Sequence, residues 1–140
     1  MYFSPEMLRG EDFGFESDWW ALGVLVYGML MGSVPFPAQG IKAMQQAIMG
    51  PDEIKIPEAR GLTLQCSNFI RKMLAKPLEK RLTTAEAIKM HPWFNDVNWY
   101  RVYRRQVPMP WSPPFDDDDL DDDEHQRASS EAMQQPSNSR

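Results

Sequence analysis

Residues 18–31 read DWWALGVLVYGMLM, and no charged residue follows Asp18 in this stretch. Apolar side chains would lie on every side of a helix formed by these residues, whereas a helix on a protein surface normally has one apolar stripe. The pattern therefore predicts a helix that runs to about Met31 and is buried on all sides. We expect Ser17 or Asp18 to cap its first turn and Gly32 to end it.

Shorter helical segments are expected on both sides of this long helix. The chain should begin with a turn or helix start over residues 1–9 and a loop over residues 10–17, and a short helix should cover Ile41–Met49. The segment Thr63–Ala75 has its apolar residues on one side, which predicts an amphipathic helix. Those apolar residues are Leu64, Phe69, Ile70, Met73 and Leu74.

A last helix should follow Thr83 or Thr84 and end near Met90. Glu86 stands three residues after Thr83, which is the spacing of a capping box. The sequence has no run of alternating apolar and polar residues that would predict a strand. The predicted fold class is therefore mainly α.

The apolar stretch Trp19–Met31 is too short to cross a bilayer, which needs about 20 residues. The first residues also lack the basic and apolar regions of a signal peptide. Cys66 is the only cysteine, so no internal disulfide can form, as expected for a protein in a reducing compartment. We expect no membrane span and an intracellular location, cytoplasmic or nuclear.

Charge is unevenly distributed along the 140 residues. Residues 116–124 contain 8 of the 20 acidic residues, and the remainder of the chain has 15 basic and 12 acidic residues. The acidic run lacks the glycine and the spacing of a calcium-binding loop, so we expect residues 116–140 to be a disordered tail. No basic patch indicates a nucleic-acid partner.

Five short motifs occur in a fixed order along the chain. They are Ser4-Pro5-Glu6, Asp18-Trp19-Trp20-Ala21-Leu22-Gly23, Lys80-Arg81-Leu82, His91-Pro92-Trp93-Phe94, and Asn98-Trp99 with Pro113-Pro114-Phe115. Together they resemble the back half of the large lobe of a protein kinase of the AGC group, which carries a C-terminal tail. The resemblance implies a partial kinase domain (large lobe) over residues 1–94, an extended tail segment over 95–115 and a disordered acidic and polar tail over 116–140.

The resemblance also implies roles for five residues of this chain. Glu6 and Arg81 would form a buried ion pair, because a planar guanidinium can bind a carboxylate with two hydrogen bonds. Asp18 would hold the backbone of the catalytic loop, and Trp20 would be structural. Tyr2 would lie in the loop that contacts the substrate residue following the phosphorylation site. Without the resemblance, solvated charges at Glu6 and Arg81 and a simple helix cap at Asp18 would be the simpler interpretation.

Asp12-Phe13-Gly14 matches the magnesium-binding triplet of kinases but stands in the wrong place. In kinases that triplet precedes the motif that Ser4-Pro5-Glu6 resembles, whereas here it follows that motif. We therefore interpret it as the loop that leads into the long helix. His91 and Cys66 are both expected to be structural, Cys66 as a small apolar residue.

The elements that carry phosphoryl transfer do not occur in the sequence. There is no Gly-x-Gly-x-x-Gly loop, and neither His91 nor His125 is followed by Arg-Asp. We therefore expect no catalytic, cofactor-binding or metal-binding residue and no activity in this chain alone, with ATP and Mg²⁺ needed only by a complete kinase. Gly28 stands where kinases that prefer basic substrates often have a glutamate, so a preference for arginine is not implied.

Three hypotheses follow for the protein. The first is an incomplete serine/threonine kinase, whose partners would be protein substrates and regulators. The second is a genuine short protein that binds other proteins, because Val24, Leu25, Tyr27 and Met29 of the long helix would lack some of their partners, and such a chain could depend on a chaperone. The third is an unrelated helical bundle.

Overall fold

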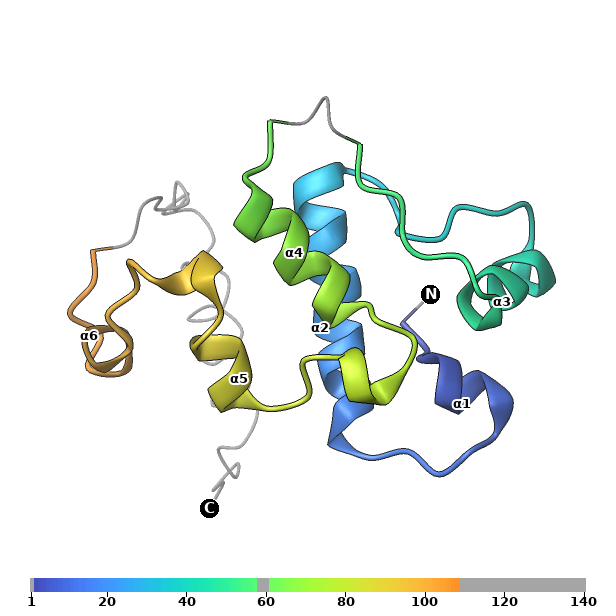
Figure 1. The fold of residues 1–140 in the computed structure, drawn as a ribbon, viewed down its shortest axis with the longest axis horizontal. Helices are drawn as coiled ribbons and strands as arrows, with labels where there is room; N and C mark the ends of the chain where they lie inside the picture. Colours follow the sequence, from blue (N-terminus) through green and yellow to red (C-terminus); the bar gives the residue numbers. More distant parts are fainter. Residues whose placement is uncertain (1, 58–60, 109–140) are drawn as a thin grey trace, which may run out of the picture. The chain divides into compact units, whose positions relative to one another are not determined.

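The structure is a computed structural model that describes residues 2–57 and 61–108 (Figure 1). It is mainly helical, as predicted, and these residues contain no strand. The elements are α1 (Pro5–Arg9), α2 (Phe15–Met31), α3 (Ile41–Met49), α4 (Leu64–Met73), the 3-10 helix η2 (Leu78–Lys80), α5 (Ala85–Lys89), the 3-10 helix η3 (Pro92–Phe94) and α6 (Trp99–Tyr103). The chain divides into two units, Met1–Tyr100 and Arg101–Arg140.

The long helix α2 ends as predicted but begins earlier than predicted. Gly32 adopts a left-handed φ of 65° after Met31 and donates its N–H to the carbonyl of Gly28, which closes the last turn. Gly14, and not Ser17 or Asp18, is the N-cap. Ser17 and Asp18 lie within the first turn, and the Ser17 hydroxyl makes a tertiary hydrogen bond to Glu6 instead of capping the helix.

The main core forms where α2 packs against α4 (Figure 1). The large apolar residues of α2 that are buried lie on one side of the helix, namely Trp20, Val24, Tyr27 and Met31. They cluster with Cys66, Ile70 and Leu74 from α4 and its end. Gly23 permits this close approach, because a Cβ added there would lie 2.9 Å from the Cβ of Met73.

The prediction that α2 is buried on all sides is wrong. Leu22, Leu25 and Met29 are exposed, although they are as apolar as their buried neighbours. The prediction that Val24 and Tyr27 would lack partners is also wrong, since both belong to the main core. Their burial follows from their position on the side of α2 that faces α4.

Helix α3 has the predicted bounds and is held at its end by a lysine. The Lys76 ammonium donates to the carbonyls of Ala47 and Gly50 at 2.7 and 2.6 Å. This places a positive charge at the negative end of the helix dipole. Burial lowers the pKa of Lys76, while Asp52 acts in the opposite direction.

Helix α4 begins as predicted, but one of its apolar residues faces outward. The Thr63 hydroxyl accepts the N–H of Cys66 at 3.1 Å and caps the first turn. Leu64 is 87% exposed, so its assignment to the apolar side is wrong. Cys66 is buried, and burial raises the pKa of its thiol, so it behaves as a small apolar residue.

A second, smaller cluster joins α4 to the segment that follows α5. Phe69, Met73 and Ile88 are buried there, with Trp93 and Phe94 of η3 packed against them. Thr84 caps α5 by accepting the N–H of Ala87 at 3.2 Å. Because Thr84 is the cap, Glu86 is only two residues away from it, and the predicted capping box with Thr83 does not form.

The segment after residue 95 is not extended throughout, because Trp99–Tyr103 forms α6. The Trp99 indole N–H donates to the carbonyl of Lys89 at 3.2 Å. The acidic run and the rest of the expected disordered tail lie outside the described residues. Among those that are described, no helix combines the length and the hydropathy needed to cross a membrane.

Candidate functional site

A buried ion pair joins two segments that lie 75 residues apart in the sequence. The two terminal nitrogens of Arg81 donate to the two carboxylate oxygens of Glu6 at 2.7 and 3.0 Å. Glu6 lies in the first turn of α1, and Arg81 follows η2. Both side chains are almost completely buried. The structure thus brings together the two charged residues that the sequence analysis paired.

The remaining hydrogen-bonding capacity of this pair is also used. The Ser17 hydroxyl donates to Glu6 at 3.1 Å, and Arg81 donates to the carbonyls of Ala75 and Lys76 at 2.7 and 3.0 Å. Burial alone would raise the pKa of Glu6, but hydrogen bonds from Arg81, the backbone and Ser4, together with the charge of Arg81, more than offset this and lower it to about 2. A pair bonded in this way can hold α1 to α2 and η2.

Trp20 lies beside this ion pair and is fully buried. The Arg81 guanidinium is 4.9 Å from the centre of its ring, and Phe36 stacks against the ring at 5.8 Å. The indole nitrogen of Trp20 has no hydrogen-bond partner among the residues that the structure describes. Trp20 therefore acts here through packing and a cation–π contact.

The opposite side of α2 carries exposed residues at a regular spacing. Phe15, Asp18, Leu22, Leu25 and Met29 follow one another at intervals of three and four residues, which places them on one side of a helix. Phe15 is 84%, Leu22 37%, Leu25 46% and Met29 68% exposed. We call these five residues the open stripe of α2. An apolar surface of this kind is typical of an interaction site.

Tyr2 and Asp18 line the same pocket, which lies at the start of the open stripe. The pocket has a volume of about 490 Å³, and its other walls come from Phe3, Met7 and Phe13. The Asp18 side chain is exposed and does not cap the helix. This arrangement offers a partner an apolar pocket with one carboxylate at its edge.

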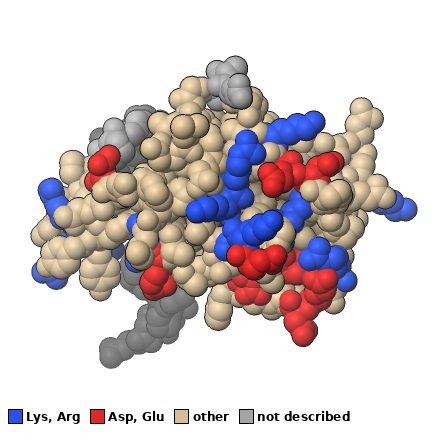
Figure 2. All heavy atoms as spheres, viewed as in Figure 1, with Lys and Arg blue, Asp and Glu red and all other residues tan. Residues whose placement is uncertain are grey.

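The segment Asp12-Phe13-Gly14 leads into α2, and its Phe13 belongs to this pocket. Within residues 2–57 and 61–108, no three His, Cys, Asp or Glu side chains are grouped so that they could hold a metal ion. On the face drawn in Figure 2, Lys and Arg side chains are interspersed with Asp and Glu. The described residues visible there form no large area of one charge.

The open stripe is the feature that reasoning from sequence missed. The apolar run of α2 predicted a helix buried on all sides and did not indicate which side stays open. The three-and-four spacing of Asp18, Leu22, Leu25 and Met29 is visible in the sequence. This spacing could have indicated which side stays open, because a charged residue such as Asp18 is seldom fully buried unless it is paired.

Comparison with known proteins matches residues 1–94 to the family described as the protein kinase domain. The chain is 35% identical over 114 residues to "Protein kinase 2" of Dictyostelium discoideum. It is 36% identical over 130 residues to "Atypical protein kinase C" of Drosophila melanogaster, and 36% over 118 residues to "Serine/threonine-protein kinase AGC1-7" of Arabidopsis thaliana. These alignments cover 80%, 84% and 82% of this chain but 23%, 21% and 21% of the relatives. The chain therefore spans less than a quarter of the length of each of these relatives.

Proposed function

Because this chain belongs to the protein kinase family, we propose that it is the later part of the large lobe of an AGC-type serine/threonine kinase. The complete protein would transfer the γ-phosphate of MgATP to a Ser or Thr hydroxyl of a protein substrate. Residues 1–94 would be the kinase-domain part, residues 95–115 the start of the tail and residues 116–140 an acidic tail. The observation that carries this proposal is the open stripe of α2, an apolar surface that stays exposed among residues 2–57 and 61–108.

The open stripe matches what an incomplete lobe should expose. Hydrophobic burial stabilises a fold in proportion to the apolar area removed from water, so three large apolar residues on one side of a central helix are costly to leave uncovered. In the complete lobe, preceding parts of the kinase domain would cover Leu22, Leu25 and Met29. Asp18, in the same stripe, would accept hydrogen bonds from the backbone of the catalytic loop.

Tyr2 would contribute to substrate binding at the pocket that it shares with Asp18. That pocket combines aromatic walls with an open side, which suits the side chain that follows the phosphorylated residue. Gly28 provides no carboxylate on α2, so we do not propose a preference for arginine in the substrate.

The chain alone would be inactive in this proposal. Phosphoryl transfer depends on positioning ATP and on stabilising charge with Mg²⁺, a lysine and an aspartate of the catalytic loop. The sequence contains no glycine-rich phosphate loop and no His-Arg-Asp motif. The Glu6–Arg81 pair, Asp18 and Trp20 would hold the lobe together and would not act on the substrate.

A second candidate function rests on the same open stripe. A short form of the protein would use the stripe and the Tyr2 pocket to bind a protein partner, such as a kinase regulator or a chaperone, without catalysis. The two candidates differ in the native size of the protein. An immunoblot with an antibody against residues 116–140 would show a band well above 16.2 kDa for the kinase and a band near 16 kDa for the short form.

The kinase proposal can be tested by a chimera. Residues 2–108 would replace the aligned segment of the fly atypical protein kinase C, and phosphorylation of a serine peptide would be measured. We expect the chimera to be active, Asp18→Ala to reduce activity by more than tenfold, and Glu11→Ala, at an exposed loop position, to leave it unchanged. A folded but inactive chimera, or MgATP binding by the isolated 140-residue chain, would contradict the proposal.

A further inference from the structure

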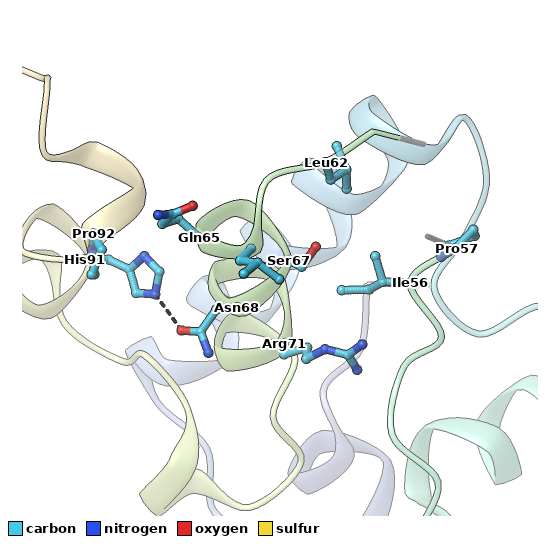
Figure 3. A pocket seen from close by; sticks show the side chains of 10 residues that line it. Ile56, Pro57, Leu62, Gln65, Ser67, Asn68, Arg71, His91 and Pro92 are labelled. Atoms are coloured by element: carbon cyan, nitrogen blue, oxygen red, sulfur yellow. Dashed lines mark hydrogen bonds between the residues drawn. The ribbon is translucent and has the colours of Figure 1, made fainter. Parts of the chain in front are cut away.

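A groove along the outer side of α4 has no role in the proposed kinase function. Its volume is about 710 Å³. Gln65, Asn68 and Arg71 form its floor, and their spacing of three residues places them along one side of α4 (Figure 3). The segment Ile56–Pro57 lies on one side of this floor and His91–Pro92 on the other (Figure 3).

His91 fixes the orientation of the Asn68 amide in this groove. Its Nδ1 accepts the N–H of Trp93 at 3.2 Å, so the ring proton is on Nε2, which donates to the Asn68 Oδ1 at 3.0 Å. Burial, and then the charge of Lys72, lowers the pKa of His91, which keeps the ring neutral. The Asn68 oxygen is therefore occupied, and its nitrogen, turned away from His91 in Figure 3, remains a donor.

Arg71 adds a positive charge to the same floor. One of its terminal nitrogens donates to the carbonyl of Ile54 at 3.3 Å, which leaves most of its N–H groups available. Arg71 makes no ion pair with the residues that the structure describes, and none of the described residues that line the groove is Asp or Glu. Arg71 also borders a neighbouring pocket. The negative charge of Glu53 in that pocket is accompanied by the positive charges of Lys76 and Lys80.

The third feature is an apolar edge near the start of α4. Leu64 is 87% exposed, and Leu62 and Ile56 are half-buried beside the groove. Leu64 does not belong to the main core, to which α4 and its end contribute Cys66, Ile70 and Leu74. The groove thus combines hydrogen-bond donors, one positive charge and an apolar edge.

From this combination we propose that the groove binds an extended acidic peptide segment of a partner protein. A carboxylate of the segment would bind Arg71, its backbone carbonyls would accept from Asn68 and Gln65, and an apolar side chain would cover Leu64 and Leu62. The floor from Gln65 to Arg71 is about 9 Å long at 1.5 Å per helical residue, which matches about three residues of extended chain. Side chains two positions apart in an extended segment point to the same side, so the recognised pattern is an apolar residue, any residue, and then Asp or Glu, or the reverse order.

The proposal does not depend on the kinase assignment. Arg71, Asn68 and Leu64 belong neither to the Glu6–Arg81 pair nor to the open stripe of α2. An inactive chimera with the fly kinase would not contradict peptide binding in the groove. Absence of peptide binding would not contradict the kinase proposal.

The test uses the full 140-residue chain and a fluorescein-labelled, end-blocked probe of sequence Gly-Leu-Ser-Glu-Gly. Its matched probe has Gln in place of Glu. Fluorescence anisotropy at near-physiological salt should show that the Glu probe binds about tenfold more tightly than the Gln probe, because charge-assisted bonds to Arg are the stronger kind. Arg71→Gln should remove this preference, and Leu64→Ser should weaken both probes. Both residues are exposed, so circular dichroism should show an unchanged fold.

Lys42→Gln is the matched control, since it removes the same charge from an exposed position on α3, outside the groove. It should leave probe binding unchanged. Equal binding of the two probes, no binding at millimolar concentration, or an equal effect of Lys42→Gln and Arg71→Gln would overturn the proposal. So would self-association in sedimentation that Leu64→Ser abolishes, because a second copy of the chain would then occupy the groove.

Discussion

The two sides of α2 are built from similar residues but have different surroundings. On one side Trp20, Val24, Tyr27 and Met31 pack against α4 and its neighbours. On the other side the open stripe, with Leu22, Leu25 and Met29, is exposed. The methionines at positions 29 and 31 show the contrast within two residues. Because both sides carry large apolar residues, hydrophobicity does not determine which side is packed. The contacts that the other segments make with each side determine it.

This difference has a geometric origin. Gly23 lies on the packed side and lets α4 approach within contact of the α2 backbone. The Glu6–Arg81 pair then fixes α1 and the segment after α4 at the same side, where Ser17 joins it. Within the described residues, the open stripe has no glycine that admits a neighbouring helix and no ion pair. Its apolar side chains therefore remain exposed and available to another segment.

The largest effect should come from breaking the ion pair that anchors the packed side. Arg81→Met leaves the Glu6 carboxylate buried without its partner, and we expect a loss of about 3–5 kcal/mol in the free energy of unfolding. The matched change Arg9→Met breaks the ion pair with Glu11, whose side chains are 41% and 53% exposed, and should cost at most about 1 kcal/mol. Urea denaturation followed by circular dichroism would measure both, and similar losses would show that the buried pair does not anchor this side.

Acid should reduce the difference between the wild type and Arg81→Met. The pKa of Glu6 is about 2 in the folded chain against an ordinary value of 4.5, so the unfolded chain binds this proton more readily. The stabilisation by Glu6 is therefore complete above pH 4.5 and is lost as the pH falls towards 2. The denaturation midpoints of the two proteins should converge over this range, and a constant separation would argue against the assignment.

A methionine pair on α2 gives the next effect and the most direct comparison of its two sides. Met31→Ala removes a buried side chain from the core and should cost about 2–5 kcal/mol. Met29→Ala removes the same atoms from the open stripe and should change stability by less than about 0.5 kcal/mol. Thermal and urea denaturation of the isolated chain would test this. A comparable loss for Met29→Ala would mean that the stripe is already covered in solution.

A glycine pair should give the smallest effects, with opposite signs. Gly23→Ala places a Cβ 2.9 Å from the Cβ of Met73, so we expect a loss of about 1–3 kcal/mol from overpacking. At Gly28 the nearest atom to an added Cβ is a carbonyl oxygen at 4.0 Å, so Gly28→Ala should stabilise the helix by up to about 1 kcal/mol. Denaturation midpoints would reveal the signs, and a harmless Gly23→Ala would show that α2 and α4 do not approach closely.

The local predictions from sequence succeeded where short-range chemistry decides the outcome. Thr84, one of the two predicted caps, caps α5 and Gly32 ends α2, because a cap depends on a side-chain oxygen or a left-handed φ at one position. The predicted cap of α2 was wrong because the Ser17 hydroxyl donates to Glu6 instead of capping the helix. The assignment of Leu64 to the apolar side of α4 was wrong, because burial in a first turn depends on where the neighbouring segments lie. Periodicity does not reveal this.

The site was predicted in part for the same reason. The sequence motifs paired Glu6 with Arg81 and named Trp20, Tyr2 and Asp18, and the structure places the first three in one buried group and the last two at one pocket. The sequence motifs did not indicate the groove on α4. Its donors, Asn68 and Arg71, become a site only because His91, 20 or more residues later in the chain, folds back to orient one of them.

The sequence by itself determined that this chain is helical, where most helices end, and to which family it belongs, because hydrophobic period, capping residues and ordered motifs are local or additive properties. Only the tertiary structure decided which side of α2 is packed, how the charges of Glu6 and Arg81 are satisfied, and where donors gather on α4. These outcomes depend on contacts between segments far apart in the chain, and the free energy of such contacts comes from the area and the polar groups that several segments bury together.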